Sequence, residues 1–508
     1  MQERFPTFFL VLGCILLTAV FIVWRAVRPA APSASTGEDA PRMHLSSKGT
    51  PSTLGLRTPG ESARNNARLR GALADYEKSR DLDALLADPS AIPGEAILRF
   101  RTPAALDAFR RAAAKAGINL LGAIPGRNLL RVGYGDLAAL ESALSGLDSD
   151  DYGAAPNYPV VIPGVPEPGS AQDPGTPLPA FGRRTFDFLG IEGDISGWGA
   201  GIRVAILDSQ VLEHSTFTAG QVRDVAFLDA GAADNTVAPG DASGHGTAVA
   251  SIVAGNDPSA LGLAPAAEIL SFAITDASGV SDSFTLSQAI FAAVDGGADL
   301  INISLGSYGD SFLVREAVAY AQENSVPIIA AAGNEGYSQL AFPAAYEGVI
   351  GVGAVDASGQ HVYFSNTGEG LSLAAPGVGV YAAWPGDDQV NFSGTSASAP
   401  FVTGELAALM STGLGATEAI EVMNAYANEA GRPGYDDQFG SGIINLGRAM
   451  ERGNPGIFDV AIASQSFADP VIASNNANQV IDIAVQNRGT EPLYNVRLEV
   501  LSGTISRS

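Results

Sequence analysis

Two hydrophobic patterns occur along the middle half of the chain, one typical of buried strands and the other typical of helices. Short apolar runs, rich in small and β-branched residues, lie at residues 202–207, 268–273, 300–304, 327–332 and 349–355. Strands that are buried on both faces of a parallel sheet have this composition. Apolar residues at helical spacing predict intervening helices at 247–253, 285–295, 312–324 and 397–410. The pattern therefore predicts an α/β parallel sheet with helices on both faces.

A second pattern precedes this region and predicts a small α+β domain over residues 93–162. The expected elements are a strand at 95–100, a helix at 103–116, two strands within 118–134, a helix at 136–147 and a strand at 158–162. The turn between the paired strands falls at Pro125-Gly126. This β-α-β-β-α-β order is the split βαβ, or ferredoxin-like, arrangement. An unrelated small α+β domain is the alternative.

Residues 456–508 alternate between apolar and polar positions. Strands are expected at 458–462, 480–485 and 496–500, and the turn at 487–490 predicts a hairpin. These strands resemble the start of an immunoglobulin-like domain. Because a complete sandwich of that type takes about 100 residues, the segment is expected to be a partial β-sandwich. It either belongs to a longer domain or packs on the domain before it.

The first 28 residues are expected to form a signal or anchor segment. Residues 5–24 are apolar and about long enough to cross a membrane as a helix. A membrane anchor and a cleaved secretory signal both fit. Arg25 and Arg28 follow the apolar run, and the positive-inside rule would then place the rest of the chain in the cytoplasm. That orientation conflicts with the export inferred below.

Two linkers complete the organisation of the chain. Residues 29–92 combine an Ala/Pro/Ser-rich tether with a charged segment that is compatible with a helix, and residues 163–184 are rich in Pro and Gly. Net charge is −25, which argues against nucleic-acid binding because such a surface repels phosphates. Cys14 is the only cysteine, so no disulfide can form within the chain.

Four polar residues in separate motifs have the chemistry of acyl transfer to a serine. Asp208 ends an apolar run, His245 lies in Gly-His-Gly-Thr, Asn334 lies in Ala-Ala-Gly-Asn-Glu-Gly, and Ser396 lies in Gly-Thr-Ser-Ala-Ser-Ala-Pro. Ser396 would be the nucleophile and His245 its general base. Asp208 would orient the imidazole, and Asn334 would donate a hydrogen bond to the oxyanion. Asp208 and Asn334 follow predicted strands, where open α/β sheets bind ligands.

These motifs, in the order Asp, His, Ser, resemble the subtilisin-like serine proteases of the subtilase family over a peptidase domain at 185–452. Gln210 departs from the family pattern, because a glycine usually stands at this point and helps the chain to turn after the strand. The resemblance implies an exported serine endopeptidase, extracellular or in the cell envelope, made as a proenzyme that processes itself. The domain at 93–162 would be its inhibitory propeptide and an intramolecular partner.

The same resemblance implies residues that bind a polypeptide substrate. Ser304, Leu305 and Gly306 would pair with the substrate backbone, Gly333 would line the first specificity pocket, and Gly279 would lie on the opposite edge strand. No cofactor is required and no metal site is assigned. Structural calcium is compatible with the family, but the loop at 256–260 offers few of the six to eight oxygen ligands that calcium takes.

One alternative is another enzyme family, and a second comes from another class of protein. Sedolisins share the Gly-Thr-Ser-Ala-Ser motif, but they use a Glu-Asp pair and an Asp in the oxyanion hole, so His245 and Asn334 argue against them. A catalytically silent adhesion or scaffold protein, or one that cuts only itself, is the other alternative. Gln210 and the adhesion-like C-terminal segment keep this second alternative open beside the intact triad.

Overall fold

The computed structural model describes residues 88–165, 177–225, 242–467 and 481–494, together with Leu82, Gly175 and Val496. The expected signal or anchor segment and nearly all of the linker at 29–92 lie outside these residues. No helix in the described ranges is long and apolar enough to cross a membrane.

A seven-stranded sheet forms the centre of the molecule, and all neighbouring strands in it are parallel. In spatial order the strands are β13 (Leu371–Pro376), β12 (Ile350–Val355), β11 (Ile328–Ala331), β10 (Leu300–Ile303), β6 (Arg203–Asp208), β8 (Glu268–Ala273) and β7 (Val222–Asp224). The five apolar runs of the sequence correspond to β6, β8, β10, β11 and β12. The predicted parallel sheet is therefore confirmed.

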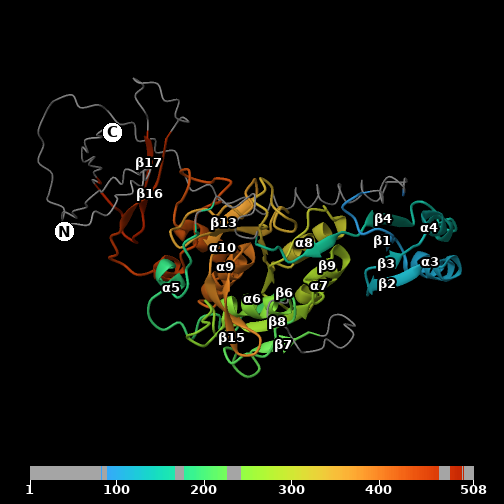
Figure 1. The fold of residues 1–508 in the computed structure, drawn as a ribbon, viewed down its shortest axis with the longest axis horizontal. Coiled ribbons are helices and arrows are strands. Elements are labelled where there is room, and N and C mark those ends of the chain that lie inside the picture. Colours follow the sequence, from blue (N-terminus) through green and yellow to red (C-terminus); the bar gives the residue numbers. More distant parts are fainter. Residues whose placement is uncertain are drawn as a thin grey trace, which may run out of the picture. The chain divides into compact units, whose positions relative to one another are not determined.

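Helices cover both faces of this sheet, because successive residues of each strand point to opposite sides. Val204 and Ile206 of β6 belong to one apolar cluster, and Ala205 and Leu207 belong to another. The first cluster includes residues of α6 (His245–Ala254) and α9 (Thr395–Met410). The second includes residues of α7 (Ser283–Asp295) and α8 (Phe312–Glu323). Figure 1 shows these helices around the sheet.

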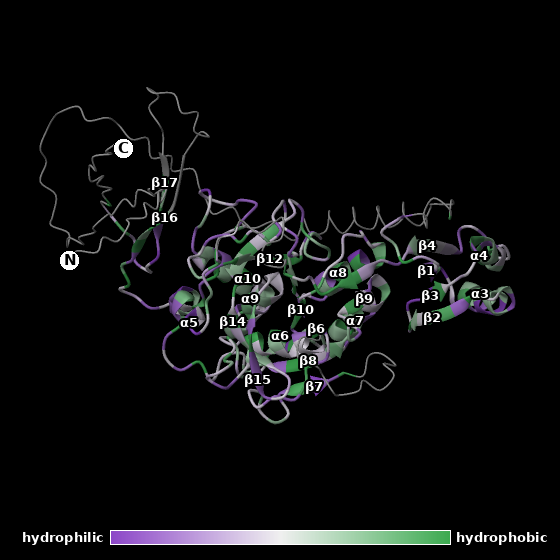
Figure 2. Cartoon of the chain, viewed as in Figure 1, coloured by the Kyte–Doolittle hydropathy of each residue, from purple (hydrophilic) through white to green (hydrophobic). Residues whose placement is uncertain are grey.

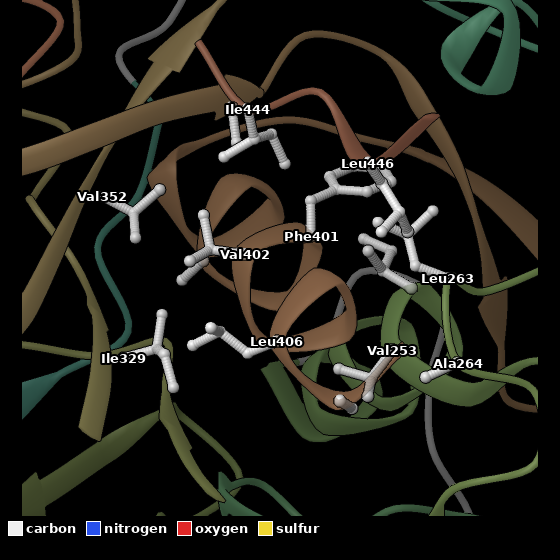
Figure 3. Packing of buried hydrophobic residues seen from close by; sticks show 14 of the residues in the cluster. Val253, Leu263, Ala264, Ile329, Val352, Phe401, Val402, Leu406, Ile444 and Leu446 are labelled. Atoms are coloured by element: carbon white, nitrogen blue, oxygen red, sulfur yellow. The ribbon is translucent and has the colours of Figure 1, made fainter. Parts of the chain in front are cut away.

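Helix α9 lies in the interior, and all but the last of its 16 residues are buried. Val402 and Leu406 point toward Val352 and Ile329 of the sheet (Figure 3). Hydrophobic residues gather in the strands and in the helices that pack on them (Figure 2). Packing along the whole length of α9 therefore holds its first turn in place.

The remaining elements around the seven-stranded sheet are short or lie at its edge. They are α5 (Thr185–Phe188), η1 (Ala242–Gly244), β9 (Val280–Asp282), the hairpin of β14 (Val380–Trp384) and β15 (Asp388–Phe392), α10 (Ala416–Tyr426) and α11 (Leu446–Glu451).

The small domain has the predicted split βαβ topology. Its elements are β1 (Glu95–Phe100), α3 (Pro103–Ala116), β2 (Asn119–Ile124), β3 (Leu129–Gly133), α4 (Leu137–Leu144) and β4 (Tyr152–Pro156). The sheet order is β2-β3-β1-β4, and every neighbouring pair is antiparallel. One face of this sheet packs under α3 and α4, and residues of the other face share a cluster with α7 and α8.

The prediction of the last strand of the small domain was wrong in both the position of the strand and its pairing partner. The strand that completes the small sheet is β4, which pairs with β1. The apolar run at 158–162 contains β5 (Pro159–Val161), which instead pairs antiparallel with β9, a strand outside the small domain. An apolar run predicts a strand, but it does not specify which sheet edge the strand will join.

Two strands follow α11, β16 (Val460–Phe467) and β17 (Ile481–Asn487), and they form an antiparallel pair. Both correspond to predicted strands, whereas the expected strand at 496–500 falls outside the described residues apart from Val496. Gln486 donates a hydrogen bond to the carbonyl of Ala427 at 2.8 Å, and Arg448 donates to the carbonyl of Tyr426 at 2.7 Å and that of Arg488 at 3.2 Å. The bonds of Gln486 and Arg488 hold the end of this strand pair against residues 427 and 448, and the bond to Tyr426 fixes the Arg448 side chain.

Candidate active site

Asp208 and His245 form a buried pair at the end of β6. The carboxylate is fully buried, and its Oδ1 accepts hydrogen bonds from His245 Nδ1 at 2.8 Å and from the Ser209 backbone N–H at 2.7 Å. The bond to Asp208 places a proton on Nδ1 and leaves Nε2 able to accept one. The His245 ring also packs edge-on against Phe392, with 5.1 Å between ring centroids.

The two glycines beside His245 are required by close packing. A Cβ on Gly244 would lie 2.5 Å from the Trp384 ring, and one on Gly246 would lie 2.1 Å from the Ser209 carbonyl oxygen. Ser209 Oγ also accepts a hydrogen bond from Gly246 N at 2.8 Å. Ser209 therefore joins the end of β6 to the first turn of α6, which begins at His245. This contribution of Ser209 was not predicted from the sequence.

Gln210 does not disturb the turn after β6. It is not among the residues with positive φ, so the backbone there does not need a glycine. Its side-chain amide lies 3.4 Å from Asp224 Oδ2, in the next strand along the chain. The departure from the family pattern at this position is accommodated by an ordinary backbone conformation.

Ser396 is the second residue of α9 and is buried. Its Oγ donates a hydrogen bond to the Ser304 carbonyl at 3.0 Å, and Ser304 Oγ donates to the Ser396 carbonyl at 3.1 Å. No hydrogen bond among the described residues joins the Ser396 hydroxyl to the His245 imidazole. The nucleophile candidate is thus close to the end of β10, and its proton points to that strand.

A buried polar chain connects Ser304 to the middle of α9. Asn302 Nδ2 donates to Ser304 Oγ at 3.0 Å, and Thr403 Oγ1 donates to Asn302 Oδ1 at 2.8 Å. All three side chains are fully buried. The hydrogen bonds fix the start of α9 relative to β10, since buried polar groups that find partners define a unique arrangement. The sequence offered no signal for Asn302 or Thr403, because both lie in otherwise apolar segments.

Asn334 has its two amide ends in different environments. Oδ1 accepts hydrogen bonds from the backbone N–H and the hydroxyl of Thr395, at 2.8 and 2.9 Å. Nδ2 therefore faces the other way and donates to the carbonyl oxygen of Pro163 at 2.9 Å. The amide that was predicted to bind an oxyanion thus binds a peptide carbonyl of the chain itself.

The segment at 159–163 occupies the predicted substrate positions. Val161 exchanges two hydrogen bonds with Gly306, at 2.8 and 2.9 Å, and Ile162 donates its N–H to the Gly279 carbonyl at 3.0 Å. Gly306 and Gly279 were predicted to pair with a substrate backbone from opposite sides. In the structure both pair with the segment that leads out of the small domain.

A cavity of about 310 Å³ adjoins this segment and is lined by Pro163, Val161, Gly306, Tyr308, Gly333 and Glu335 among others. Gly333 has φ +108°, and a Cβ there would lie 2.2 Å from Asn366 Nδ2. Burial, together with a hydrogen bond to Glu335, raises the pKa of Tyr308, so its hydroxyl stays protonated and donates to that carboxylate. Leu305 is fully buried in the core, so only its backbone is available to a substrate.

The side chains that could bind a metal ion do not form a cluster in the described ranges. In the part of the chain that the structure describes, no three His, Cys, Asp or Glu side chains are placed together to bind a metal ion. In the loop at 256–260, Asp257 Oδ1 accepts hydrogen bonds from the N–H and the hydroxyl of Ser259.

Comparison with known proteins gives the class to which this fold and site belong. Residues 199–442 match the model of the Subtilase family. The chain is 34% identical over 249 residues to alkaline elastase YaB of Bacillus sp. (strain YaB), covering 49% of this chain and 64% of that protein. It is 33% identical over 249 residues to subtilisin Savinase of Lederbergia lenta, covering 49% of this chain and 90% of that protein.

The crystal structure of fervidolysin from Fervidobacterium pennivorans, a keratinolytic enzyme related to subtilisin, has the same fold. It superposes with a TM-score of 0.58 at 23% identity, over 79% of this chain and 69% of fervidolysin. The fold is that of the subtilisin-type serine proteases. The chain belongs to the subtilase family.

Proposed function

We propose that this protein is an exported serine endopeptidase that hydrolyses peptide bonds through an acyl-enzyme at Ser396. The observation that carries this proposal is the buried 2.8 Å hydrogen bond between Asp208 Oδ1 and His245 Nδ1. It leaves Nε2 as the only ring nitrogen that can take a proton from a nucleophile. A buried imidazole with one fixed tautomer is suited to general-base catalysis.

Three side chains would carry the reaction. Ser396 Oγ would attack the substrate carbonyl carbon as its proton passes to His245 Nε2. Asn334 Nδ2 and the backbone N–H of Ser396, at the start of a helix, would donate to the oxyanion. The same imidazole would then protonate the leaving amine, and water would hydrolyse the ester by the reverse route.

The small domain and the segment that follows it would act as an inhibitory propeptide. Support comes from two contacts between side chains of the two domains. Arg99 Nη2 lies 2.5 Å from Glu316 Oε1, and Arg131 Nη1 lies 2.6 Å from Asp282 Oδ2. Residues 159–163 occupy the strand positions that a polypeptide substrate would need. Substrate could therefore enter only after this segment leaves. Export would depend on the apolar run at 5–24, either as an anchor or as a cleaved signal.

Labelling with a fluorophosphonate probe tests the proposed chemistry directly. We expect the purified chain, after it has matured, to be labelled and to hydrolyse casein, and we expect Ser396→Ala to abolish both. Ser393→Ala is the matched control, since Ser393 directly precedes the Ser396 motif and its hydroxyl oxygen accepts a hydrogen bond from Gly379 N at 2.8 Å, away from the proposed chemistry. A folded protein that shows neither labelling nor hydrolysis would instead support the silent adhesion or scaffold alternative.

A further inference from the structure

The segment that fills the cleft has a defined direction and register relative to Ser396. Val161 pairs with Gly306, and the carbonyl of Pro163 accepts the Asn334 hydrogen bond. Val165 then lies beside the start of α9, since its Cγ2 is 3.4 Å from the position of a Cβ on Gly394. The chain therefore passes the nucleophile between residues 163 and 165. The peptide bond that follows the carbonyl bound by Asn334 is Pro163–Gly164.

Proline at position 163 leaves a gap in the antiparallel hydrogen-bond pattern. Because Val161 and Gly306 exchange both of their hydrogen bonds, the next such pair in this ladder consists of residues 163 and 304. Any other residue at position 163 would direct its N–H toward the Ser304 carbonyl. Proline has no N–H. The Ser304 carbonyl instead accepts the hydroxyl of Ser396 at 3.0 Å.

This exchange of partners affects the reaction, because the proton of Ser396 must pass to His245 during attack. A hydroxyl that donates to the Ser304 carbonyl is not donating to the imidazole. An N–H at position 163 would supply that carbonyl with a partner and would hold the acyl residue by one more strand hydrogen bond. Pro163 thus lacks one hydrogen bond that would align the Pro163–Gly164 peptide bond for attack. It also favours the orientation in which the Ser396 hydroxyl donates to the Ser304 carbonyl and not to His245.

We propose that Pro163–Gly164 is the bond cut when the chain matures, and that Pro163 slows this cut. The inference rests on the proposed peptidase activity. In this step Ser396 Oγ bonds to the carbonyl carbon of Pro163, and the bond from that carbon to Gly164 N breaks. The Ser396 proton passes through His245 to Gly164 N. Water then hydrolyses the ester, which releases a carboxylate on Pro163 and restores the Ser396 hydroxyl.

The time course of maturation of the full chain tests both parts. Wild type, Pro163→Ala and Ser396→Ala are incubated after purification, and intact mass with N-terminal sequencing follows the products. We expect a new N-terminus at Gly164 in the first two proteins and none in Ser396→Ala. One additional strand hydrogen bond and a freed hydroxyl predict that Pro163→Ala matures roughly 3- to 10-fold faster than wild type.

Pro159→Ala is the matched control, because Pro159 lies in the same segment but four residues before the bond. Its rate of maturation should stay within about twofold of wild type, as expected for a substitution that touches no catalytic group. Pro163→Gly restores the N–H without adding a side chain, and it should also mature faster. Circular dichroism of each variant in the Ser396→Ala background checks that the chain is folded.

Three results would overturn the inference. A mature N-terminus other than Gly164, or an active chain that stays uncut, contradicts the assigned bond. Unchanged or slower maturation of both folded Pro163 variants contradicts the role of proline. In each of these cases the fluorophosphonate probe still labels Ser396, so the proposed function stands. Loss of labelling in the wild-type protein is the separate outcome that contradicts the proposed function.

Discussion

The two halves of the candidate site differ in how their polar groups find partners. In the half formed by β6 and α6, Asp208 and His245 bind each other at 2.8 Å. In the half formed by β10, α9 and Asn334, the reactive groups bind the backbone instead. Ser396 donates to the Ser304 carbonyl and Asn334 donates to the Pro163 carbonyl. The first half is arranged without the small domain, whereas the second half is occupied by the segment that follows it.

The difference indicates where latency resides under the proposed function. The Asp208–His245 hydrogen bond depends only on residues of the peptidase domain, so removal of residues 159–163 should leave it unchanged. In the second half, Asn334 donates to the Pro163 carbonyl of a segment that must leave before a substrate can bind, and Ser396 donates to the Ser304 carbonyl beside that segment. Control of activity would therefore act on substrate binding and on the orientation of Ser396, and not on the assembly of the general base.

The largest effect is expected from Asp208→Asn, which changes only the first half. An amide at position 208 can donate to Nδ1, which stabilises the wrong tautomer and leaves Nε2 protonated. We expect kcat for a peptide substrate to fall about 10⁴-fold, the magnitude known for this substitution in trypsin-like enzymes. Each variant is matured in trans by a trace of tagged wild-type protein, which is then removed. A loss below tenfold would show that His245 does not depend on Asp208.

Asn334→Ala tests the second half in the same assay. Removal of the amide donor should lower kcat about 10²- to 10³-fold with little change in KM, as in subtilisin, a relative of this chain. Thr395→Val is a milder variant, because it removes one of the two hydrogen bonds to Asn334 Oδ1 and keeps the volume of the side chain. It should cost less than Asn334→Ala. An effect of Asn334→Ala on KM alone would mean that this amide binds substrate and transition state equally.

Much of the first half of the site could be predicted from the sequence because its determinants are local. Strands buried on both faces produce unbroken apolar runs, and Asp208 ends one of them. Glycines on both sides of His245 indicate close packing, and the structure shows Trp384 and the Ser209 carbonyl within contact distance. A three-residue edge strand such as β7, with the sequence Val-Arg-Asp, has no such pattern and was not predicted.

The second half could be predicted only in part, because its contacts join residues far apart in the chain. The motif around Ser396 indicates a nucleophile, but the partner of its hydroxyl lies 92 positions away. The apolar run at 158–162 indicates a strand, but its partner strand is more than 100 positions away. Such pairings depend on which edges the folded domains leave open, and hydrophobic periodicity carries no information on that point.

Helix α9 supports the second half, and Glu405 within it predicts a dependence of stability on pH. Both carboxyl oxygens are buried, and among the described residues neither has a hydrogen-bond partner. Burial raises the pKa of Glu405 to about 8, compared with about 4.5 in an unfolded chain. Between these pH values the unfolded chain releases a proton that the folded chain keeps. The contribution of Glu405 to stability therefore falls as pH rises from about 4.5 to about 8.

Glu405→Gln removes this titration and almost preserves the shape of the side chain. In the Ser396→Ala background, urea unfolding should give similar free energies for both proteins near pH 4. By pH 8 the glutamine variant should be more stable by a few kcal/mol, on the order of the pKa difference multiplied by 1.36 kcal/mol. A difference that does not change with pH would mean that Glu405 has a charged partner or is hydrated.

The smallest effect is expected where the small domain meets the peptidase domain. Arg131 donates to Asp282 at 2.6 Å and to Glu95 at 2.8 Å, and Asp282 also caps α7. Arg131→Met leaves these partly buried carboxylates without their cation. We expect a loss of about 1–3 kcal/mol in the urea unfolding of the small domain, measured in the Ser396→Ala background.

Arg110→Met is the matched control for this interface. Arg110 faces Asp107 at 3.7 Å on the exposed surface of α3, and exposed pairs of this kind contribute about 0–1 kcal/mol. Hydrogen exchange at β9 gives the second readout, because release of β5 should expose the Val280–Asp282 backbone in Arg131→Met and not in Arg110→Met. Equal effects of the two substitutions would mean that apolar packing against α7 and α8 holds the segment in the cleft. The second half of the candidate site would then be blocked independently of the Arg131–Asp282 ion pair.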